Sequence, residues 1–274
     1  MMNSCLNHLV IRMNINNNSS GYQRVHSQPA YILHTQAYQN TSLIIDAFTA
    51  NFGRLRFVAK GAKRLKAPFA GKLQVFTPLL LSWAGKGDLY TLTDADFTTS
   101  SQLLYLHGQQ PLRGSVLLSC YYLNELLLRF LILEDPHPEL FYYYVDALEN
   151  LSMKKNIESV LRIFEKRLLQ ETGYSLVLNC DINTGEPIDA LKTYHYILNE
   201  GPHSAAYESE LSERCNPEYD GIQVLGKTLL ELERGSFSNR QTLKQAKQLM
   251  RAVIALHLGD KPLKTRALFQ STIL

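Results

Sequence analysis

The sequence lacks an apolar run long enough to cross a membrane. Its most hydrophobic stretch, residues 126–133, is interrupted by Arg129, whereas a membrane-spanning helix needs about 20 consecutive, mostly apolar residues. Near the N-terminus, Arg12 and several asparagines break any hydrophobic segment, so we expect no secretory signal. These absences predict a cytoplasmic protein without a membrane partner.

Cysteine is scarce and widely spaced. Cys5, Cys120, Cys180 and Cys215 form no CxxC pair, and the histidines fall in no HExxH pattern. A zinc ribbon or a thiol redox centre would need such pairs at short spacing. We therefore expect free thiols, no bound metal or cofactor, and no catalytic centre built from these residues.

Acidic residues are missing from residues 47–87, although this segment carries eight basic side chains. The rest of the chain carries 20 basic against 25 acidic residues, so the net charge of +3 belongs to this one segment. Solvated surfaces usually mix the two signs. A segment of one sign instead favours a polyanionic partner, such as the phosphate backbone of DNA.

The spacing of these cations favours a shared surface. Side chains alternate between the two faces of a strand, so Arg54, Arg56 and Lys60 would lie on one face, and the following loop would add further cations. The candidate DNA-binding residues are Arg54, Arg56, Lys60, Lys63, Arg64, Lys66 and Lys72. The alternatives are a merely solubilising face, or a protein-interaction scaffold whose basic face meets an acidic protein.

Two types of periodicity predict an α+β chain. Residues 29–98 contain about five short runs rich in β-branched and aromatic residues, separated by turns, which is typical of a small antiparallel barrel or sandwich. Residues 99–274 are mainly helical, with an irregular insertion at about residues 174–223. Helices are expected over residues 115–134, 137–151, 157–172, 224–234 and 239–258, the last with Ser238 as N-cap. Residues 1–28 show neither periodicity, so we expect a disordered extension.

Residues 221–228, GIQVLGKT, match the Walker A pattern GxxxxGK[ST]. A P-loop needs small, turn-forming residues between its glycines, because successive N–H groups must curl around phosphate. Ile222 and Val224 are β-branched, and a polar segment containing Pro217 precedes the motif. We interpret the match as a coincidence in which Gly226 precedes a helix, and keep a P-loop nucleotidase as an alternative.

Several motifs in the same order closely resemble the DNA repair protein RecO family. They are YILHT at residues 31–35, TSL at 41–43, GRLRFVAKGA at 53–62 and LQVFTPL at 73–79, followed by YYLNELLLRF, VLRIFEKRLLQETGY and GDKPLKTRALF. The resemblance covers nearly everything after residue 29 and implies an N-terminal OB-fold barrel followed by a mainly helical domain. Some members carry two CxxC pairs in the insertion, where this chain has only Cys180 and Cys215; it resembles the metal-free branch.

The resemblance also implies a function. Members are recombination mediators that are not enzymes: they bind single- and double-stranded DNA, anneal complementary strands and, with RecR, help load the RecA recombinase on DNA coated with single-stranded DNA-binding protein. A nucleoid-associated cytoplasmic location follows.

The resemblance further implies a pocket in the helical domain for the acidic C-terminal tail of the single-stranded DNA-binding protein. Arg162 is the first candidate to meet its carboxylate, with Lys166 and Arg167 in reserve, because a guanidinium can pair bidentately with a carboxylate. The alternative is an ion pair within the helix between Arg162 and Glu158 or Glu165.

Overall fold

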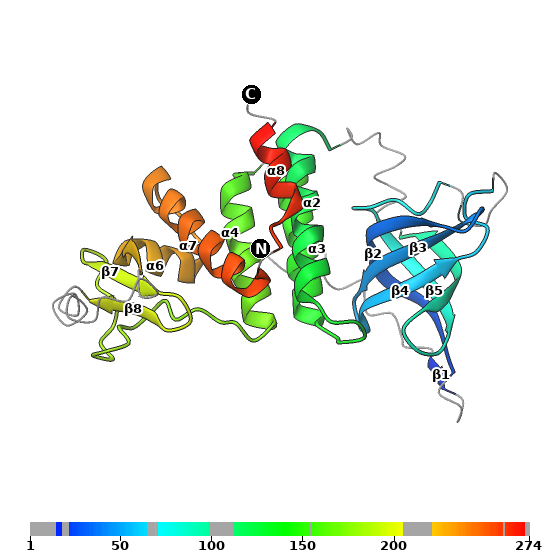
Figure 1. Cartoon of the computed structure of the whole chain (residues 1–274), viewed down its shortest axis with the longest axis horizontal. Helices are drawn as coiled ribbons and strands as arrows, with labels where there is room; N and C mark the ends of the chain where they lie inside the picture. The colour runs from blue at the N-terminus through cyan, green and yellow to red at the C-terminus, as the bar shows by residue number, and fades with distance from the viewer. Residues whose placement is uncertain are drawn as a thin grey trace. The chain divides into compact units, whose positions relative to one another are not determined.

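The computed structural model describes residues 15–17, 22–64, 69, 71–98, 112–153, 155–204, 221–259 and 261–271. These residues form two compact units, whose elements are labelled in Figure 1. The first unit contains the described residues up to Gly114 together with Cys120–Tyr142, and the second contains Ser115–Ser119 and the residues from Tyr143 onward. The first unit thus includes most of a helix that the division at residue 98 had placed in the helical domain.

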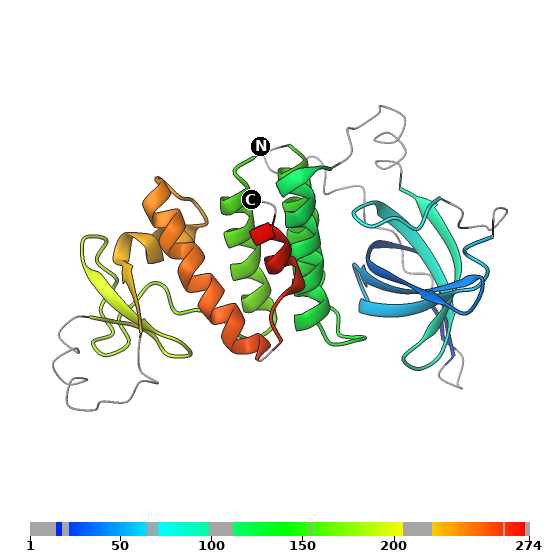
Figure 2. The same cartoon turned by 45° about the horizontal axis from the view of Figure 1, so that its top comes forward.

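The first unit is built around a closed β-barrel. Its strands are β1 (Ile15–Asn17), β2 (Gln23–Tyr38), β3 (Ser42–Thr49), β4 (Gly53–Ala59), β5 (Pro78–Gly85) and β6 (Tyr90–Phe97). Strands β2, β3, β4, β6 and β5 pair in that order, and β2 also pairs with β5, which closes the ring seen in Figure 2. All of these pairings are antiparallel except that of β4 with β6. This is the strand arrangement of an OB-fold, so the predicted fold is confirmed.

Alternation along the strands fills the barrel interior. Leu55, Phe57 and Ala59 of β4 are buried in the core, as their spacing predicts. Trp83 of β5 is fully buried, and its ring centre lies 5.4 Å from that of Phe57. The side chains of the alternate residues of β4 therefore lie on the outer face of the barrel.

The expectation of a disordered extension over residues 1–28 is wrong where the structure describes that segment. β1 pairs with the start of β2, and β2 begins at Gln23. Val25 is fully buried and pairs with Trp83 of β5. The alternation is interrupted by a register shift between Val25 and Gln28, which hides the strand from a period-two search.

Helix α2 (Gly114–Phe130) and the start of α3 (Pro138–Ser152) also belong to the first unit. α2 ends four residues before the predicted end, because Leu131 is extended and Leu133 forms a parallel bridge with Arg54 of β4. Pro138 is the first residue of α3, a position where its missing N–H leaves no bond unmade. Among the described residues, no helix has the length and hydrophobicity to cross a membrane.

The second unit combines helices with a small sheet. Its elements are α4 (Ile157–Glu171), β7 (Thr193–Ile197), β8 (Gly201–Ser204), β9 (Ile222–Leu225), α6 (Gly226–Arg234), α7 (Arg240–Leu258) and α8 (Lys264–Ser271). The strands lie in the order β8-β7-β9, so the described part of the predicted insertion contains short extended pieces. α7 packs against α4 and α6. Asn239, rather than the predicted Ser238, caps α7: its side chain accepts a hydrogen bond of 2.9 Å from the N–H of Thr242.

One glycine of the barrel offers a test of this packing. Gly53 has a φ of +67°, and a Cβ atom there would lie 1.9 Å from the main-chain oxygen of Asp135. We expect Gly53→Ala to lower the free energy of unfolding by about 2 to 5 kcal/mol, because backbone strain and a steric clash add. Gly87→Ala is the control for backbone strain alone, since φ at Gly87 is +73° but no atom lies within 4 Å of a Cβ placed there. Denaturant unfolding measures both; equal losses would contradict the close approach of β4 to Asp135.

Candidate nucleic-acid interface

The outer face of β2, β3 and β4 carries an ordered set of polar and basic side chains. The strand register places His34 beside Asp46, Asp46 beside Arg56, Gln36 beside Ile44, Ile44 beside Val58, and Tyr38 beside Ser42, with Lys60 directly after the end of β4. In OB-folds, this face and the adjoining loops bind oligonucleotides. The predicted alternation of Arg54, Arg56, Val58 and Lys60 along one face of β4 is therefore present.

One end of this face is covered by the helical segment of the same unit. The ring of Phe141 in α3 lies 5.4 Å from that of Phe48 in β3 and 5.9 Å from that of Tyr31 in β2. The amide of Asn124 in α2 donates to the main-chain oxygen of Leu33 in β2 at 2.9 Å. The described residues of α2 and α3 therefore cover this end of the face, and the other end carries the exposed polar and basic side chains.

Arg54 lies at the covered end and acts as a structural residue. Its guanidinium donates to the carboxylate of Asp46 at 2.7 and 3.1 Å, and to the main-chain oxygens of Leu128 and Leu131 at 2.8 and 3.2 Å. Its side chain is only 13% exposed. The DNA-binding role expected of Arg54 is not supported, because these internal acceptors already occupy the guanidinium.

Arg56 lies next to the boundary between the covered and open ends. Its guanidinium is 3.5 Å from the same carboxylate of Asp46, but the side chain remains 40% exposed. Its Nε is buried and has no hydrogen-bond partner among the described residues. The positive charge of Arg56 is therefore only partly balanced by the carboxylate of Asp46.

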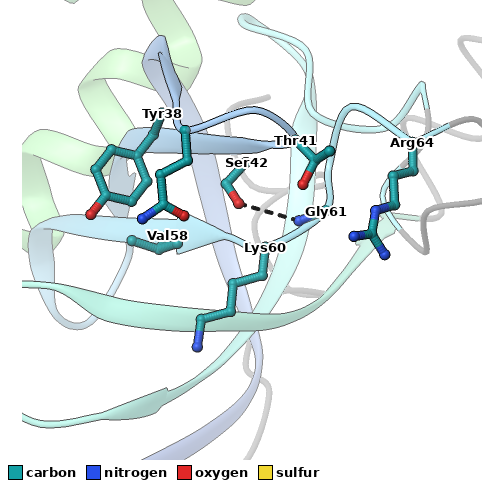
Figure 3. A pocket seen from close by; sticks show the side chains of 8 residues that line it. Tyr38, Thr41, Ser42, Val58, Lys60, Gly61 and Arg64 are labelled. Atoms are coloured by element: carbon teal, nitrogen blue, oxygen red, sulfur yellow. Dashed lines mark hydrogen bonds between the residues drawn. The ribbon is translucent and has the colours of Figure 1, made fainter.

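The open end forms a pocket of about 410 Å³, shown in Figure 3. It is lined by Tyr38, Gln39, Thr41, Ser42, Val58, Lys60, Gly61 and Arg64. The N–H of Lys63 donates to the carbonyl of Thr41 at 2.9 Å, and that of Gly61 donates to the hydroxyl of Ser42 at 3.4 Å. These bonds fix the loop after β4 against the turn between β2 and β3.

The cations of this loop differ in how far they are neutralised. Lys60, Lys63 and Arg64 are exposed, and no carboxylate among the described residues pairs with them. Lys72 forms a 2.7 Å ion pair with Asp96, whose side chain is exposed. Lys66 lies outside the described residues. The uncompensated positive charge thus gathers around the pocket.

The aromatic residues of the basic segment pack against other aromatic or apolar side chains of the first unit. Phe57, Phe69 and Trp83 belong to the core, Phe52 packs on Trp83, and Phe76 packs on Tyr121. The exposed aromatic residue of the pocket is Tyr38, which lies outside the basic segment and was not predicted. The signal that could have found it is its alternation with His34 and Gln36, since these polar residues mark the outer face of β2.

Arg162, the first candidate for tail binding, is buried in α4 and only 3% exposed. It pairs bidentately with Glu165; the bond from Nε to Oε2 measures 2.6 Å. The alternative interpretation, an ion pair within the helix, is thus the one that the structure shows. The tail-binding role expected of Arg162 is not supported, because its guanidinium is already neutralised away from solvent.

The two reserve cations of α4 are also engaged. Lys166 is buried and its ammonium donates to the main-chain oxygen of Glu233; burial holds its pKa below the ordinary value, although the nearby carboxylate of Glu233 opposes the shift. Arg167 is half-buried and lies 4.7 Å from the ring centre of Tyr143 in a cation–π contact. Arg167 is the most accessible of the three.

Comparisons with known proteins cover both units. The family description "Recombination protein O N terminal" matches residues 24–101, and "Recombination protein O C terminal" matches residues 113–267. DNA repair protein RecO of Nitrosospira multiformis is 43% identical over 90% of this chain and 96% of its own length. The RecO proteins of Nitrosococcus oceani and Coxiella burnetii are 42% and 43% identical, over 90% of this chain and 94% and 98% of their own lengths. The chain belongs to the RecO family.

Within the RecO C-terminal domain, residues 221–228 do not form a P-loop. Residues 222–225 are strand β9, paired with β7, and α6 begins directly at Gly226. The N–H groups of Gly226 and Lys227 donate to the carbonyls of Lys192 and Ala190 at 2.8 and 3.1 Å, and the buried Thr228 hydroxyl donates to Gln245 at 2.6 Å. The N–H groups of Gly226 and Lys227 are therefore bonded internally. A helix does follow the strand, as expected, but it begins at Gly226 itself, and residues 224 and 225, which were expected to be helical, belong to β9.

The insertion where some RecO proteins carry cysteine pairs is fixed here by a carboxylate. Asp181 accepts hydrogen bonds from the N–H groups of Asn183 at 2.8 Å, Ser204 at 2.9 Å and Thr184 at 3.3 Å. Burial alone would raise the pKa of Asp181, but these hydrogen bonds outweigh it and lower the pKa. The described residues contain no cluster of His, Cys, Asp or Glu side chains placed to hold a metal, and Cys215 lies outside them.

We expect the purified protein neither to bind nor to hydrolyse ATP, because the GIQVLGKT segment is strand and helix. Lys227→Ala should leave thermal stability nearly unchanged, since its side chain is 47% exposed and its nearest carboxylate, that of Glu231, is 3.9 Å away. Binding of labelled ATP and release of phosphate are the measurements. Micromolar ATP affinity that disappears in Lys227→Ala would contradict this interpretation of the segment.

Proposed function

We propose that this chain is a recombination mediator in DNA repair that acts on DNA without catalysing a reaction itself. It binds single- and double-stranded DNA, anneals complementary strands and, with RecR, helps load RecA on DNA coated with single-stranded DNA-binding protein, at the nucleoid. Membership of the RecO family supports this proposal. The single observation that carries the DNA-binding part is the uncompensated cluster of Lys60, Lys63 and Arg64, fixed beside the open end of the OB face.

The cluster explains how the chain would hold DNA of any sequence. Lys60 and Arg64 line the pocket, and the main chain of Lys63 is bonded to the turn after β2, so their charges stay close together. Cations that meet phosphates release counterions and give affinity without reading bases. Annealing benefits in the same way, because two strands approach each other more easily when their phosphates are neutralised. The proposed contact set is Arg56, Lys60, Lys63 and Arg64, with Lys66 and Lys72 as further candidates; Arg54 is left out.

We expect log affinity for DNA to fall with log salt at a slope of about −3 to −4.5, since four or five phosphate contacts contribute about 0.7 to 0.9 each. Lys60→Glu with Arg64→Glu should weaken binding on every sequence and flatten the slope by about 2. Fluorescence anisotropy with oligonucleotides measures both quantities.

The matched control is Lys244→Glu with Arg251→Glu, which changes the net charge equally at exposed positions of α7. It should leave the affinity close to that of the wild type. If the barrel variant bound DNA as the wild type does, the cluster would be a solubilising face or a protein-binding surface, and the DNA proposal would be withdrawn.

For the acidic tail of the single-stranded DNA-binding protein, we propose a different place from α4. A small pocket of about 140 Å³ lies between the end of α7 and the start of α8, with Ile254, Leu258 and Leu263 as apolar lining and Lys261 and Arg266 as cations. An apolar floor with cations at its edge suits a tail that ends in an aromatic residue and a carboxylate.

This placement predicts that Arg266→Glu weakens binding of a tail peptide at least tenfold, because it reverses the charge that would face the carboxylate. Arg167→Glu, the same change on α4, should leave the affinity unchanged. Isothermal titration with the peptide compares the two variants. If Arg167→Glu weakened peptide binding and Arg266→Glu did not, the tail would bind along α4 and the proposal for the α7–α8 pocket would be wrong.

A further inference from the structure

Tyr38 is an aromatic residue of the OB face that the barrel itself does not use. It is the last residue of β2, it is 37% exposed, and it lines the same pocket as Lys60 and Arg64. Figure 3 shows its ring on one side of the pocket, Arg64 on the opposite side and Lys60 between them. No aromatic ring among the described residues packs against it, whereas the rings of Tyr31, Phe52 and Phe76 are all engaged.

The strand holds Tyr38 in place before any ligand binds. Its main chain pairs with that of Ser42 at the start of β3, and the hydroxyl of Ser42 accepts the N–H of Gly61. Val58 of β4 lines the pocket beside it. The paired backbone fixes the position from which the ring projects, so only the side-chain torsions of Tyr38 remain to be ordered on binding.

The pocket combines the two features that single-stranded nucleic acid requires. Its volume of about 410 Å³ falls in the range of small-ligand sites, so it can accept one nucleotide. Cations track the phosphates, and an aromatic face receives a base that is not already stacked and paired. In a duplex, the bases face each other inside the helix, and only the phosphates can reach the cations.

Resting on the DNA-binding function proposed above, we infer that Tyr38 stacks on an unpaired base of single-stranded DNA whose phosphates lie on Lys60 and Arg64. The ring then adds affinity for single strands that a duplex does not receive. The cations contact the phosphates of both single- and double-stranded DNA, whereas Tyr38 contacts a base of single-stranded DNA alone.

The test compares Tyr38→Ala, Tyr38→Phe and Tyr38→Trp on an oligothymidine strand and on a duplex of equal length. Tyr38→Ala should bind the single strand about 5- to 100-fold more weakly, the range found for loss of one base-stacking contact. On the duplex the change should stay within about twofold, and the two aromatic variants should behave as the wild type on both. Tyr38 is exposed at the end of a strand, so unfolding curves of all three should match that of the wild type.

Two further measurements separate stacking from charge. A strand with abasic sites throughout keeps the phosphates and removes the bases; on it, wild type and Tyr38→Ala should bind equally. Because Trp83 is the only tryptophan and is fully buried, the new emission of Tyr38→Trp reports on the pocket and should be quenched by the oligothymidine strand and not by the duplex.

The outcomes distinguish this inference from the function on which it rests. The stacking role is overturned, and the DNA-binding function stands, if the wild type binds DNA through Lys60 and Arg64 but Tyr38→Ala retains full affinity for the single strand. The same conclusion follows if the single strand leaves the emission of the Tyr38→Trp variant unaffected. If reversing the charges of Lys60 and Arg64 leaves binding unchanged, the proposed function itself fails.

Discussion

The carboxylate of Asp46 determines which part of the barrel's outer face is open to a ligand. It accepts two hydrogen bonds from Arg54, whose guanidinium also donates to main-chain oxygens at the end of α2. Without Asp46, the guanidinium of Arg54 would stay largely buried without the carboxylate that balances its charge, and removing one partner of a buried ion pair costs about 3 to 5 kcal/mol. These contacts tie β3 and β4 to the helical segment that covers this end of the face. A ligand is thereby directed to the other end, where Tyr38 and Lys60 lie.

The pairing of each cation, rather than its place in the sequence, decides what it can do. Arg54 follows the same alternation as Arg56, yet its acceptors lie 8, 74 and 77 residues away. Period-two alternation predicts a common face, and the face is present. It does not predict which carbonyls another segment brings to that face. The partner of Arg162 could be predicted from the sequence, because Glu165 lies only three residues away in the same helix.

The barrel could be predicted because its signals are local. Turn residues and short β-branched runs specify strands, and the helical domain follows from apolar spacing. The first residues of β2 could not be predicted, since a register shift near Ser27 breaks the alternation. Residues 222–225 are strand because β7 pairs with them, a contact made across 28 residues. The alternation of Tyr38 with His34 and Gln36 would have placed it on the outer face of β2, but its exposure there also depends on which side chains of other segments pack against it, and the sequence does not give those contacts.

The same reasoning ranks the remaining cations. The Lys72–Asp96 pair is exposed at the carboxylate, and such pairs contribute less than about 1 kcal/mol, so a phosphate can replace Asp96 at little cost. A phosphate that replaced the acceptors of Arg54 would instead have to break its buried hydrogen bonds to Asp46, Leu128 and Leu131. The phosphate path that we propose therefore runs from Arg56 past Lys60 to Arg64, with Lys72 as a proposed extension. Because the path passes the ring of Tyr38, a flexible single strand can turn a base onto it while its backbone follows the cations. A stiff duplex would meet the same charges with its bases held inside. Under our proposal, one surface therefore binds both forms of DNA and distinguishes them by the stacking on Tyr38.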